Sequence, residues 1–163
     1  MALKRATRTG QVLRIPLLCD PDYRARRLER LPEAEAEEKL FFETLDTKVL
    51  KTDLTNVTHV MIRGLNGSAF AEANAAAYEA MRGKEWTEAG FNMAYMTEVV
   101  RRGLLGIDGD DPGCPAPALY PIENLSGDGG YGEMWAVMLL ELNARIRTWG
   151  TLGESVGSSS VPS

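Results

Sequence analysis

The stretch VTHVMIRGLNGSAFAEANAAAYEAM, residues 57–81, decides the fold class because it changes from a strand pattern to a helix pattern within a few residues. Its opening part is rich in β-branched and other apolar side chains between polar residues and glycine, which predicts a strand over residues 56–63. The sequence NGS at 66–68 then supplies helix-capping chemistry, and apolar residues recur at helical spacing until Gly83. A strand followed by an amphipathic helix predicts an α+β protein.

Three further segments repeat apolar residues every three or four positions and therefore predict helices. They run from about Glu33 to Leu45 behind Pro32, from a Thr87 cap to Gly103 or Gly106, and from about Glu133 to Thr148 with Gly150 as the stop. The expected apolar sides of the first two are Ala36, Leu40, Phe41 and Leu45, and Phe91, Tyr95, Val99 and Leu104.

A short apolar run over residues 12–18 predicts a weak strand, which Pro16 confines to a sheet edge or a strand end because proline donates no ladder hydrogen bond. The expected fold is thus α+β and mainly α-helical, with three to four helices, a small N-terminal β element and an extended C-terminal tail. We divide the chain into a basic N-terminal arm with a short strand (1–30), a helical globular domain (31–150) and a flexible or partner-bound tail (151–163).

Charge is distributed unevenly along the 163 residues, whose net charge is −5. Residues 1–30 hold eight basic and three acidic side chains, a net charge of +5, so the remainder carries −10. This favours an arm that meets an acidic surface, either a protein or a phosphate backbone, unless it is simply a solvated face. The basic residues predicted to bind a partner are Arg24, Arg26, Arg27 and Arg30. Nucleic acid is the less favoured ligand, because the chain as a whole is acidic. In addition, Tyr23 is the only aromatic residue beside this cluster, so the stacking surface of a single-strand binder is missing.

The last predicted helix has an unusually wide apolar face. Such a helix is either central in the core or partly given to a partner. On the second interpretation, the face that would accept a partner is Trp135, Leu139, Leu142, Ile146 and Trp149.

Motifs with catalytic or ligand-binding chemistry are weak. Gly127, Gly129 and Gly132 match GxGxxG, but no βαβ unit precedes them, so a hinge before the last helix is the expected role. An EF-hand that begins at Asp108 fails, because Leu119 would occupy the position of the bidentate glutamate. We therefore predict no catalytic, cofactor-binding or metal-binding residues, and no enzymatic activity.

Histidine and cysteine usage agrees with that prediction. His59 is the single histidine, too few for a zinc cluster or for a triad with evident partners. Cys19 and Cys114 are far apart and form no CxxC pair, which is typical of a reducing compartment. We expect no signal peptide and no membrane span, since the longest apolar run, residues 134–140, is far shorter than the roughly 20 residues a spanning helix needs.

A strand ending in IRGL, a capped helix, a second helix ending in VVRRGLLGIDG, an acidic proline-containing loop and a last helix follow one another over residues 57–150. Together with the opening VLRIPLL and its basic run, this order resembles small assembly and structural proteins of tailed bacteriophages. The likeness covers about two thirds of the chain and is nearest to the tail assembly chaperone class.

The resemblance implies a non-enzymatic protein that binds the apolar tape-measure helix during tail assembly, in the host cytoplasm. Other expected partners are tail or neck subunits and further copies of the chain itself. An alternative is a head–tail connector, tube or decoration subunit retained in the virion, where the N-terminal arginines could touch nucleic acid. A small nucleotide-binding enzyme is the least favoured alternative.

Overall fold

The computed structural model describes residues 11–108 and 134–159 of the chain. The elements in chain order are β1 (Val12–Pro16), α1 (Pro21–Leu28), α2 (Glu33–Thr44), the 3-10 helix η1 (Thr47–Val49), β2 (His59–Arg63), α3 (Gly67–Met81), α4 (Glu88–Gly103), β3 (Leu104–Ile107) and α5 (Met134–Ser159). The fold is α+β and mainly helical, which confirms the predicted class.

The three strands form one antiparallel sheet in the order β1-β2-β3. Pro16 is the last residue of β1 at the sheet edge and pairs with His59, as its missing N–H predicted. The strand β3 was not predicted, because its residues LLGI extend the apolar pattern of the preceding helix. It pairs with β2, with Ile107 opposite Val60, so the sheet draws on both halves of the described sequence.

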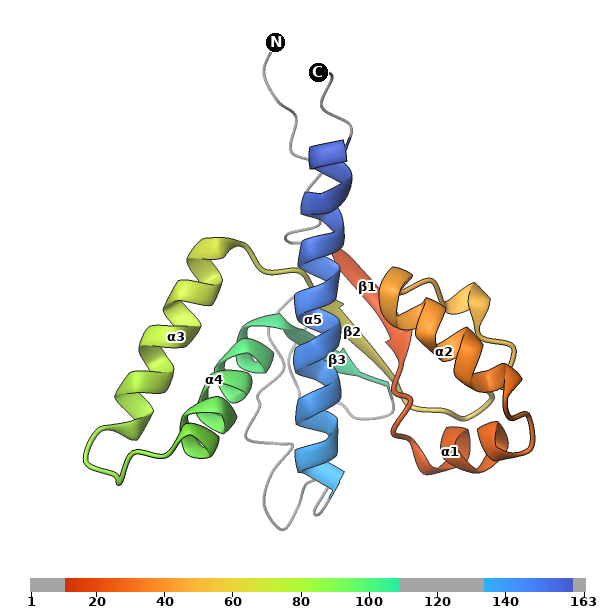
Figure 1. Ribbon diagram of the computed structural model, residues 1–163, viewed down its shortest axis with the longest axis horizontal. Helices are drawn as coiled ribbons and strands as arrows, with labels where there is room; N and C mark the ends of the chain where they lie inside the picture. Colours follow the sequence, from red (N-terminus) through yellow and green to blue (C-terminus); the bar gives the residue numbers. More distant parts are fainter. Residues whose placement is uncertain (1–10, 109–133, 160–163) are drawn as a thin grey trace.

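The helix α5 crosses in front of the sheet, with α3 and α4 on one side of it and α1 and α2 on the other (Figure 1). It contacts β2, α2 and α4. The helix thus joins the two flanking helix pairs to the sheet between them.

The core lies where α5 meets the sheet and the flanking helices. Its largest fully buried side chains are Ile15, Val60 and Ile62 from the strands, Tyr23 and Phe41 from α1 and α2, Val99 at the end of α4, Leu104 from β3, and Leu139, Leu142 and Ile146 from α5. Alternate residues of β2 are buried, as a half-buried strand requires.

Local capping follows the sequence closely in α3 and α4. The Asn66 side chain accepts a hydrogen bond from the N–H of Ala69, and the Thr87 hydroxyl accepts one from the N–H of Gly90. The predicted end of α4 at Gly103 is confirmed. A Cβ at Gly103 would lie 2.6 Å from Ile146 Cγ2, so this glycine also lets α5 approach closely.

The buried side of α2 matches the predicted one in part, since Phe41 and Leu45 are buried as expected. Ala36 and Leu40 are exposed, whereas Ala34, Glu38 and Phe41 are buried. The prediction of Ala36 and Leu40 as core residues is wrong, because α2 turns a carboxylate rather than leucine toward α1.

The helix α5 corrects two predictions. It does not stop at Gly150 but continues to Ser159, so residues 151–159 of the predicted tail are helical. Its predicted docking face is core: Leu139, Leu142, Ile146 and Trp149 are buried, and Trp135 is partly buried against the same cluster. Four of the five predicted docking residues are therefore part of the core and offer no apolar area to a partner, whereas Trp135 stays partly exposed.

Candidate protein-binding surface

The structure places the four predicted partner-binding arginines on or next to α1, which is folded against the body rather than extended as an arm. Tyr23 in the first turn of α1 is fully buried. Arg26 donates from its guanidinium to the carbonyl oxygens of Asp53 and Thr55, at 3.0 and 2.6 Å. Arg27 and Arg30 pair with glutamates of α2. Residues 11–30 are therefore folded onto the body, residues 1–10 of the predicted basic arm lie outside the described residues, and the binding of a partner by these arginines stays a prediction.

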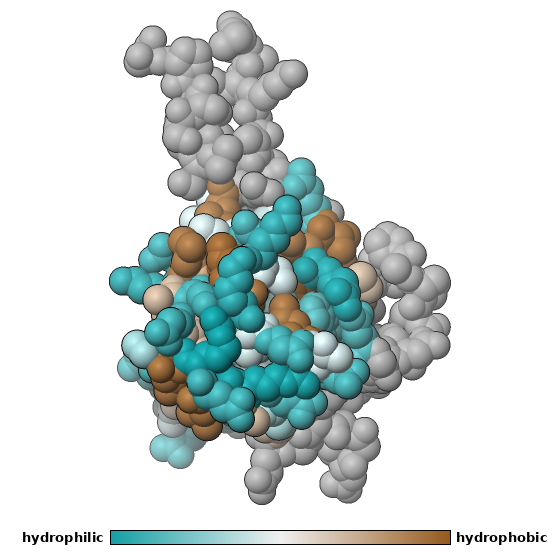
Figure 2. All heavy atoms as spheres, turned by 90° about the vertical axis from the view of Figure 1, so that its right-hand side faces the viewer, coloured by the Kyte–Doolittle hydropathy of each residue, from teal (hydrophilic) through white to brown (hydrophobic). Residues whose placement is uncertain are grey.

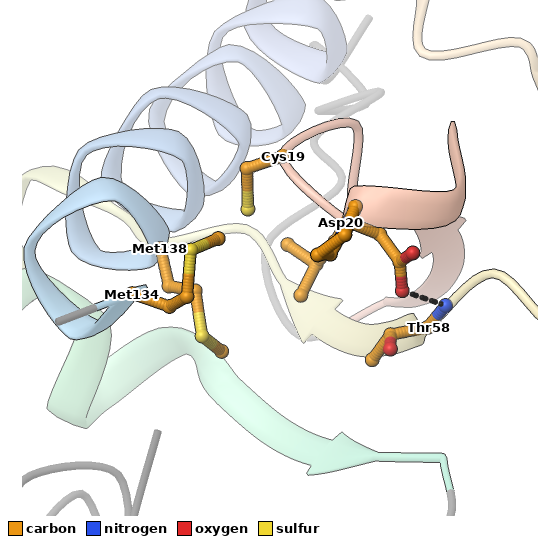
Figure 3. A pocket seen from close by; sticks show the side chains of 7 residues that line it. Cys19, Asp20, Thr58, Met134 and Met138 are labelled. Atoms are coloured by element: carbon orange, nitrogen blue, oxygen red, sulfur yellow. Dashed lines mark hydrogen bonds between the residues drawn. The ribbon is translucent and has the colours of Figure 1, made fainter. Parts of the chain in front are cut away.

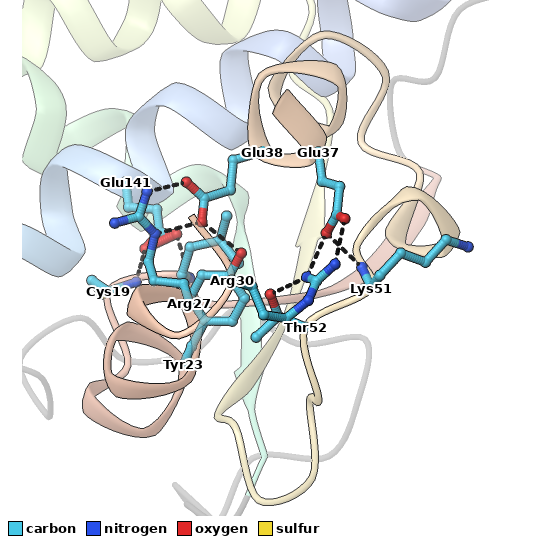
Figure 4. A network of polar contacts seen from close by, with 10 residues as sticks. Cys19, Tyr23, Arg27, Arg30, Glu37, Glu38, Lys51, Thr52 and Glu141 are labelled. Carbon is cyan, nitrogen blue, oxygen red and sulfur yellow. Dashed lines mark hydrogen bonds and ion pairs between the residues drawn. The ribbon is translucent and has the colours of Figure 1, made fainter. Parts of the chain in front are cut away.

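Glu38 is the centre of a polar cluster between α1 and α2 (Figure 4). Its Oε2 accepts hydrogen bonds from the Tyr23 hydroxyl at 2.7 Å and from Arg27 Nε at 2.6 Å, and its Oε1 accepts one from Arg27 Nη2 at 2.7 Å. Burial alone would raise the pKa of the Glu38 carboxyl, but these hydrogen bonds outweigh it and hold the pKa below its ordinary value. Both oxygens of this carboxylate are occupied within the chain.

A second pair extends the cluster toward η1. Glu37 accepts two hydrogen bonds from Arg30, at 2.9 and 2.7 Å, and one from the backbone N–H of Lys51 at 2.9 Å. Arg30 also donates to the Thr52 hydroxyl at 2.8 Å. The hydrogen bonds from Arg30 lower the pKa of Glu37 to about 2, so this carboxylate is ionised and paired at neutral pH.

Glu141 ties α5 to the connection between β1 and α1. Its two carboxylate oxygens accept hydrogen bonds from the backbone N–H groups of Leu18, at 2.6 Å, and Cys19, at 3.1 Å. Two backbone donors that no strand partner reaches are satisfied in this way.

An open groove of about 330 Å³ lies where these elements meet, between α5 on one wall and α1, α2 and the β1–α1 connection on the other. The carboxylates of Glu38 and Glu141 line it together with the guanidinium groups of Arg24 and Arg145. Its apolar lining includes Phe42 of α2 and Val137 and Leu140 of α5.

Large apolar side chains at this groove are exposed to solvent. The exposed fractions are 38% for Phe42, 47% for Val137 and 55% for Leu140. Seen from the side of α1 and α2, the surface is largely hydrophilic, with apolar areas at its margins (Figure 2). An apolar area beside polar groups is the arrangement expected of a protein-binding surface. We define these three residues with Arg24 and Arg145 as the α2–α5 groove.

A second group of exposed aromatic residues lies on α3, α4 and the turn between them. Trp86 stacks on Tyr78 with ring centres 5.6 Å apart, and Phe91 lies 4.7 and 5.0 Å from these two rings. The rings bury part of their surface against one another and hold the two helices together. This role inside the helical hairpin makes them a weaker candidate for a partner surface than the α2–α5 groove.

A small cavity of about 70 Å³ lies between the start of α5 and the β1–α1 connection, lined by sulfur from Cys19, Met134 and Met138 (Figure 3). The Asp20 carboxylate beside it accepts hydrogen bonds from the N–H groups of Asp22 and Thr58, both at 2.8 Å. Cys19 is a free thiol. Burial and the charge of Glu141 raise its pKa far above the ordinary value, so it is a protonated, weak nucleophile at neutral pH.

Side chains that ligate metal ions are not clustered in the part of the chain that the structure describes. Within residues 11–108 and 134–159 there is no group of three or more His, Cys, Asp or Glu residues that could hold a metal ion. His59 lies half-buried on β2 with Nδ1 2.9 Å from the Val57 carbonyl oxygen. Gly127, Gly129, Gly132 and Cys114 lie outside the described residues. None of the described helices combines the length and apolar composition needed to cross a bilayer.

The sequence reasoning missed Phe42, Val137, Leu140 and Arg145 as surface residues. The period of α5 offered one signal, because Val137 and Leu140 broaden the apolar stripe beyond what the core uses. Nothing in the linear pattern indicates that Phe42, nearly a hundred residues earlier, lies beside them. No protein-family model, curated protein or solved structure matches this chain.

Proposed function

We propose that this chain is a non-enzymatic assembly protein of a tailed bacteriophage that acts by binding another polypeptide at the α2–α5 groove. The observation that carries the proposal is the exposure of Phe42, Val137 and Leu140 side by side with charged groups in one groove. Burial of these side chains against a partner would remove apolar area from water, at roughly 25 cal/mol per Å².

The phage assignment draws on the resemblance of residues 57–150 to the tail assembly chaperone class. A chaperone of that kind needs an apolar surface for a partner helix while it remains folded itself. The α2–α5 groove supplies this surface without drawing on the core face of α5, on which Leu139, Leu142 and Ile146 hold the fold. A retained virion subunit would use the same surface against a neighbouring subunit.

Site-specific photo-crosslinking in phage-infected cells tests the proposal. A benzophenone amino acid replaces Leu140 in the groove or, as a matched control, Glu72, an exposed residue of α3. We expect a crosslink from position 140 to one phage protein, identified by mass spectrometry, and none from position 72. A tape-measure partner supports a chaperone, and a neck, tube or capsid partner supports a virion subunit.

Two results contradict the proposal at different levels. A crosslink from position 140 to a host protein alone contradicts the phage assignment and leaves the binding role. Equal crosslinking from positions 72 and 140, or none from either while the variants accumulate in folded form, contradicts the groove as a binding surface.

A further inference from the structure

Two arginines and two glutamates line the α2–α5 groove, and the two kinds of side chain differ in how they are bonded within the chain. Both carboxylates in it are occupied, Glu38 by Tyr23 and Arg27, and Glu141 by two backbone N–H groups. The guanidinium groups of Arg24 and Arg145, by contrast, make no ion pair with any residue in 11–108 or 134–159. The groove therefore retains guanidinium donors without an ion-pair partner, whereas its carboxylate acceptors are already used.

Arg145 is in an unusual position for an unpaired cation. Its guanidinium carbon lies 4.1 Å from the centre of the Phe42 ring, and its Nε is buried with no hydrogen-bond partner within the described residues. Burial lowers the pKa of Arg145, and the charge of Glu141, four residues earlier on α5, opposes this effect only in part. Arg145 also lines the groove, so a ligand carboxylate there would give the guanidinium group the charged acceptor that it lacks in the free protein.

Apolar side chains flank this cation on the exposed surface. Val137 and Leu140 are three residues apart on α5 and form one ridge, and Phe42 faces it from α2. A ridge of this spacing on one helix is the usual docking surface for a second helix. The matching ligand has apolar side chains at helical spacing with an acidic side chain beside them.

We propose that the α2–α5 groove binds an acidic amphipathic helix of another polypeptide, with a carboxylate of that helix paired to Arg145 and Arg24. The inference rests on the proposed binding function and specifies its partner by charge. It is argued from charge complementarity: the groove offers two unpaired guanidinium groups, and its carboxylates are already bonded within the chain. The net charge of the whole chain is −5, which repels anions in general, so we expect an acidic ligand to be attracted only at this local site.

Three model peptides measure the charge preference directly. They share one helical pattern of leucines, and the positions flanking the leucines are all glutamate, all glutamine or all lysine. Binding to the full chain is followed by fluorescence anisotropy of a labelled peptide at low and high salt. We expect the glutamate peptide to bind about tenfold or more tightly than the glutamine peptide at low salt, with a smaller ratio at high salt.

Substitutions of single arginines test which residues cause the preference for the glutamate peptide. Arg145→Gln should reduce the glutamate-to-glutamine ratio to near one, and Arg24→Gln should reduce it in part. Arg147→Gln, on the exposed side of the same helix, should leave the ratio unchanged. Because Arg145 also packs on Phe42, thermal unfolding of each variant checks its fold, and the exposed Arg24→Gln keeps the test decisive if Arg145→Gln unfolds.

Each contrary result has a distinct meaning. Equal binding of the glutamate and glutamine peptides, lost in Leu140→Ser, overturns the acidic partner and leaves an apolar binding role intact. Binding of the glutamate peptide that survives both arginine substitutions, or no binding by any peptide, overturns this inference, and crosslinking at position 140 judges the proposed function separately.

Two other occupants are tested with the same protein. A short DNA duplex that binds through Arg145 in place of the glutamate peptide would overturn the inference in favour of a phosphate ligand. Sedimentation that shows a dimer, broken by Leu140→Ser, would overturn it in favour of a second copy of the chain.

Discussion

Glu38 shows how one residue can shift the side on which a helix packs. It is buried on α2 where an apolar residue would be expected, and Leu40 is 46% exposed in the same helix. Burial of a carboxylate is tolerated because its hydrogen-bond acceptors are filled by Arg27 and Tyr23. A charged cluster of this kind is sensitive to the loss of any one member.

Glu38→Ala is expected to lower the free energy of unfolding by about 3 kcal/mol, because it leaves Arg27 and Tyr23 without their acceptor. Arg27→Ala should also destabilise, and the double variant should lose less than the sum, with a coupling of about 1–2 kcal/mol. Urea denaturation measures all three. Glu43→Ala, exposed on the same helix, is the control and should change stability by less than about 0.5 kcal/mol. Additive losses would show that the pair is not coupled.

Glu37 predicts a pH dependence of stability. Its pKa is about 2 in the folded protein against an ordinary value of 4.5, so its contribution to stability is full above pH 4.5 and is lost as the pH falls toward 2. Glu37→Gln should therefore be less stable than the parent chain at neutral pH, and the difference should shrink as the pH falls through this window. Urea unfolding over a pH series measures it, and parallel pH profiles for the two proteins would contradict it.

At the scale of the element, α5 contains a glycine, Gly150, whose role is to allow a close approach to another segment and not to end the helix. Gly150 is buried within the helix, and a Cβ there would lie 2.9 Å from the backbone oxygen of Leu65 and 3.3 Å from its nitrogen. The glycine lets the helix axis pass close to the connection between β2 and α3. The helix therefore continues through a residue that usually ends one.

Gly150→Ala is expected to destabilise the protein by up to about 2 kcal/mol. Overpacking against backbone costs about 1–3 kcal/mol, which exceeds the gain in helix propensity of about 1 kcal/mol. Gly67→Ala at the start of α3 is the matched control, because nothing lies within 4 Å of its added Cβ, and it should be neutral or slightly stabilising. Thermal and urea unfolding measure both. A stabilised Gly150→Ala would show that α5 does not approach Leu65 closely.

At the scale of the whole molecule, α5 connects parts of the chain that are distant in sequence. Its buried residues meet the sheet and both helix pairs, and its polar groups reach the N-terminal half of the chain. Glu141 receives the N–H groups of Leu18 and Cys19, and the Trp149 indole donates to the Gln11 carbonyl oxygen at 3.0 Å. The described structure should therefore unfold as one cooperative unit.

Glu141→Ala is expected to destabilise the protein by about 2–3 kcal/mol, because two backbone N–H groups lose a charged acceptor. Arg147→Ala on the exposed side of α5 is the control and should be near neutral. Unfolding followed by near-ultraviolet and far-ultraviolet circular dichroism should give coincident transitions for each protein. A Glu141→Ala variant as stable as the control would show that the β1–α1 connection is held by other contacts.

The sequence alone determined α2, α3, α4 and most of α5, the α+β class, the central strand and the caps at Asn66 and Thr87, but it did not predict α1. These depend on spacing of three or four residues and on side chains that reach only a few residues along the chain. It also predicted Pro16 at the edge of the sheet, since a missing N–H is a local property.

Only the tertiary structure decided which apolar face is core and which is surface. Four of the five α5 residues predicted for docking are buried in the core and Trp135 packs partly against it. Phe42 lies beside Leu140 through contact between α2 and α5. Hydrogen-bond acceptors within the chain bind Arg26, Arg27 and Arg30. In contrast, Arg24 and Arg145 line a groove whose carboxylates accept hydrogen bonds from other groups. The spacing of apolar residues predicts which side of an element is buried. It does not predict which other element covers that side, because this depends on contacts between residues far apart in the chain.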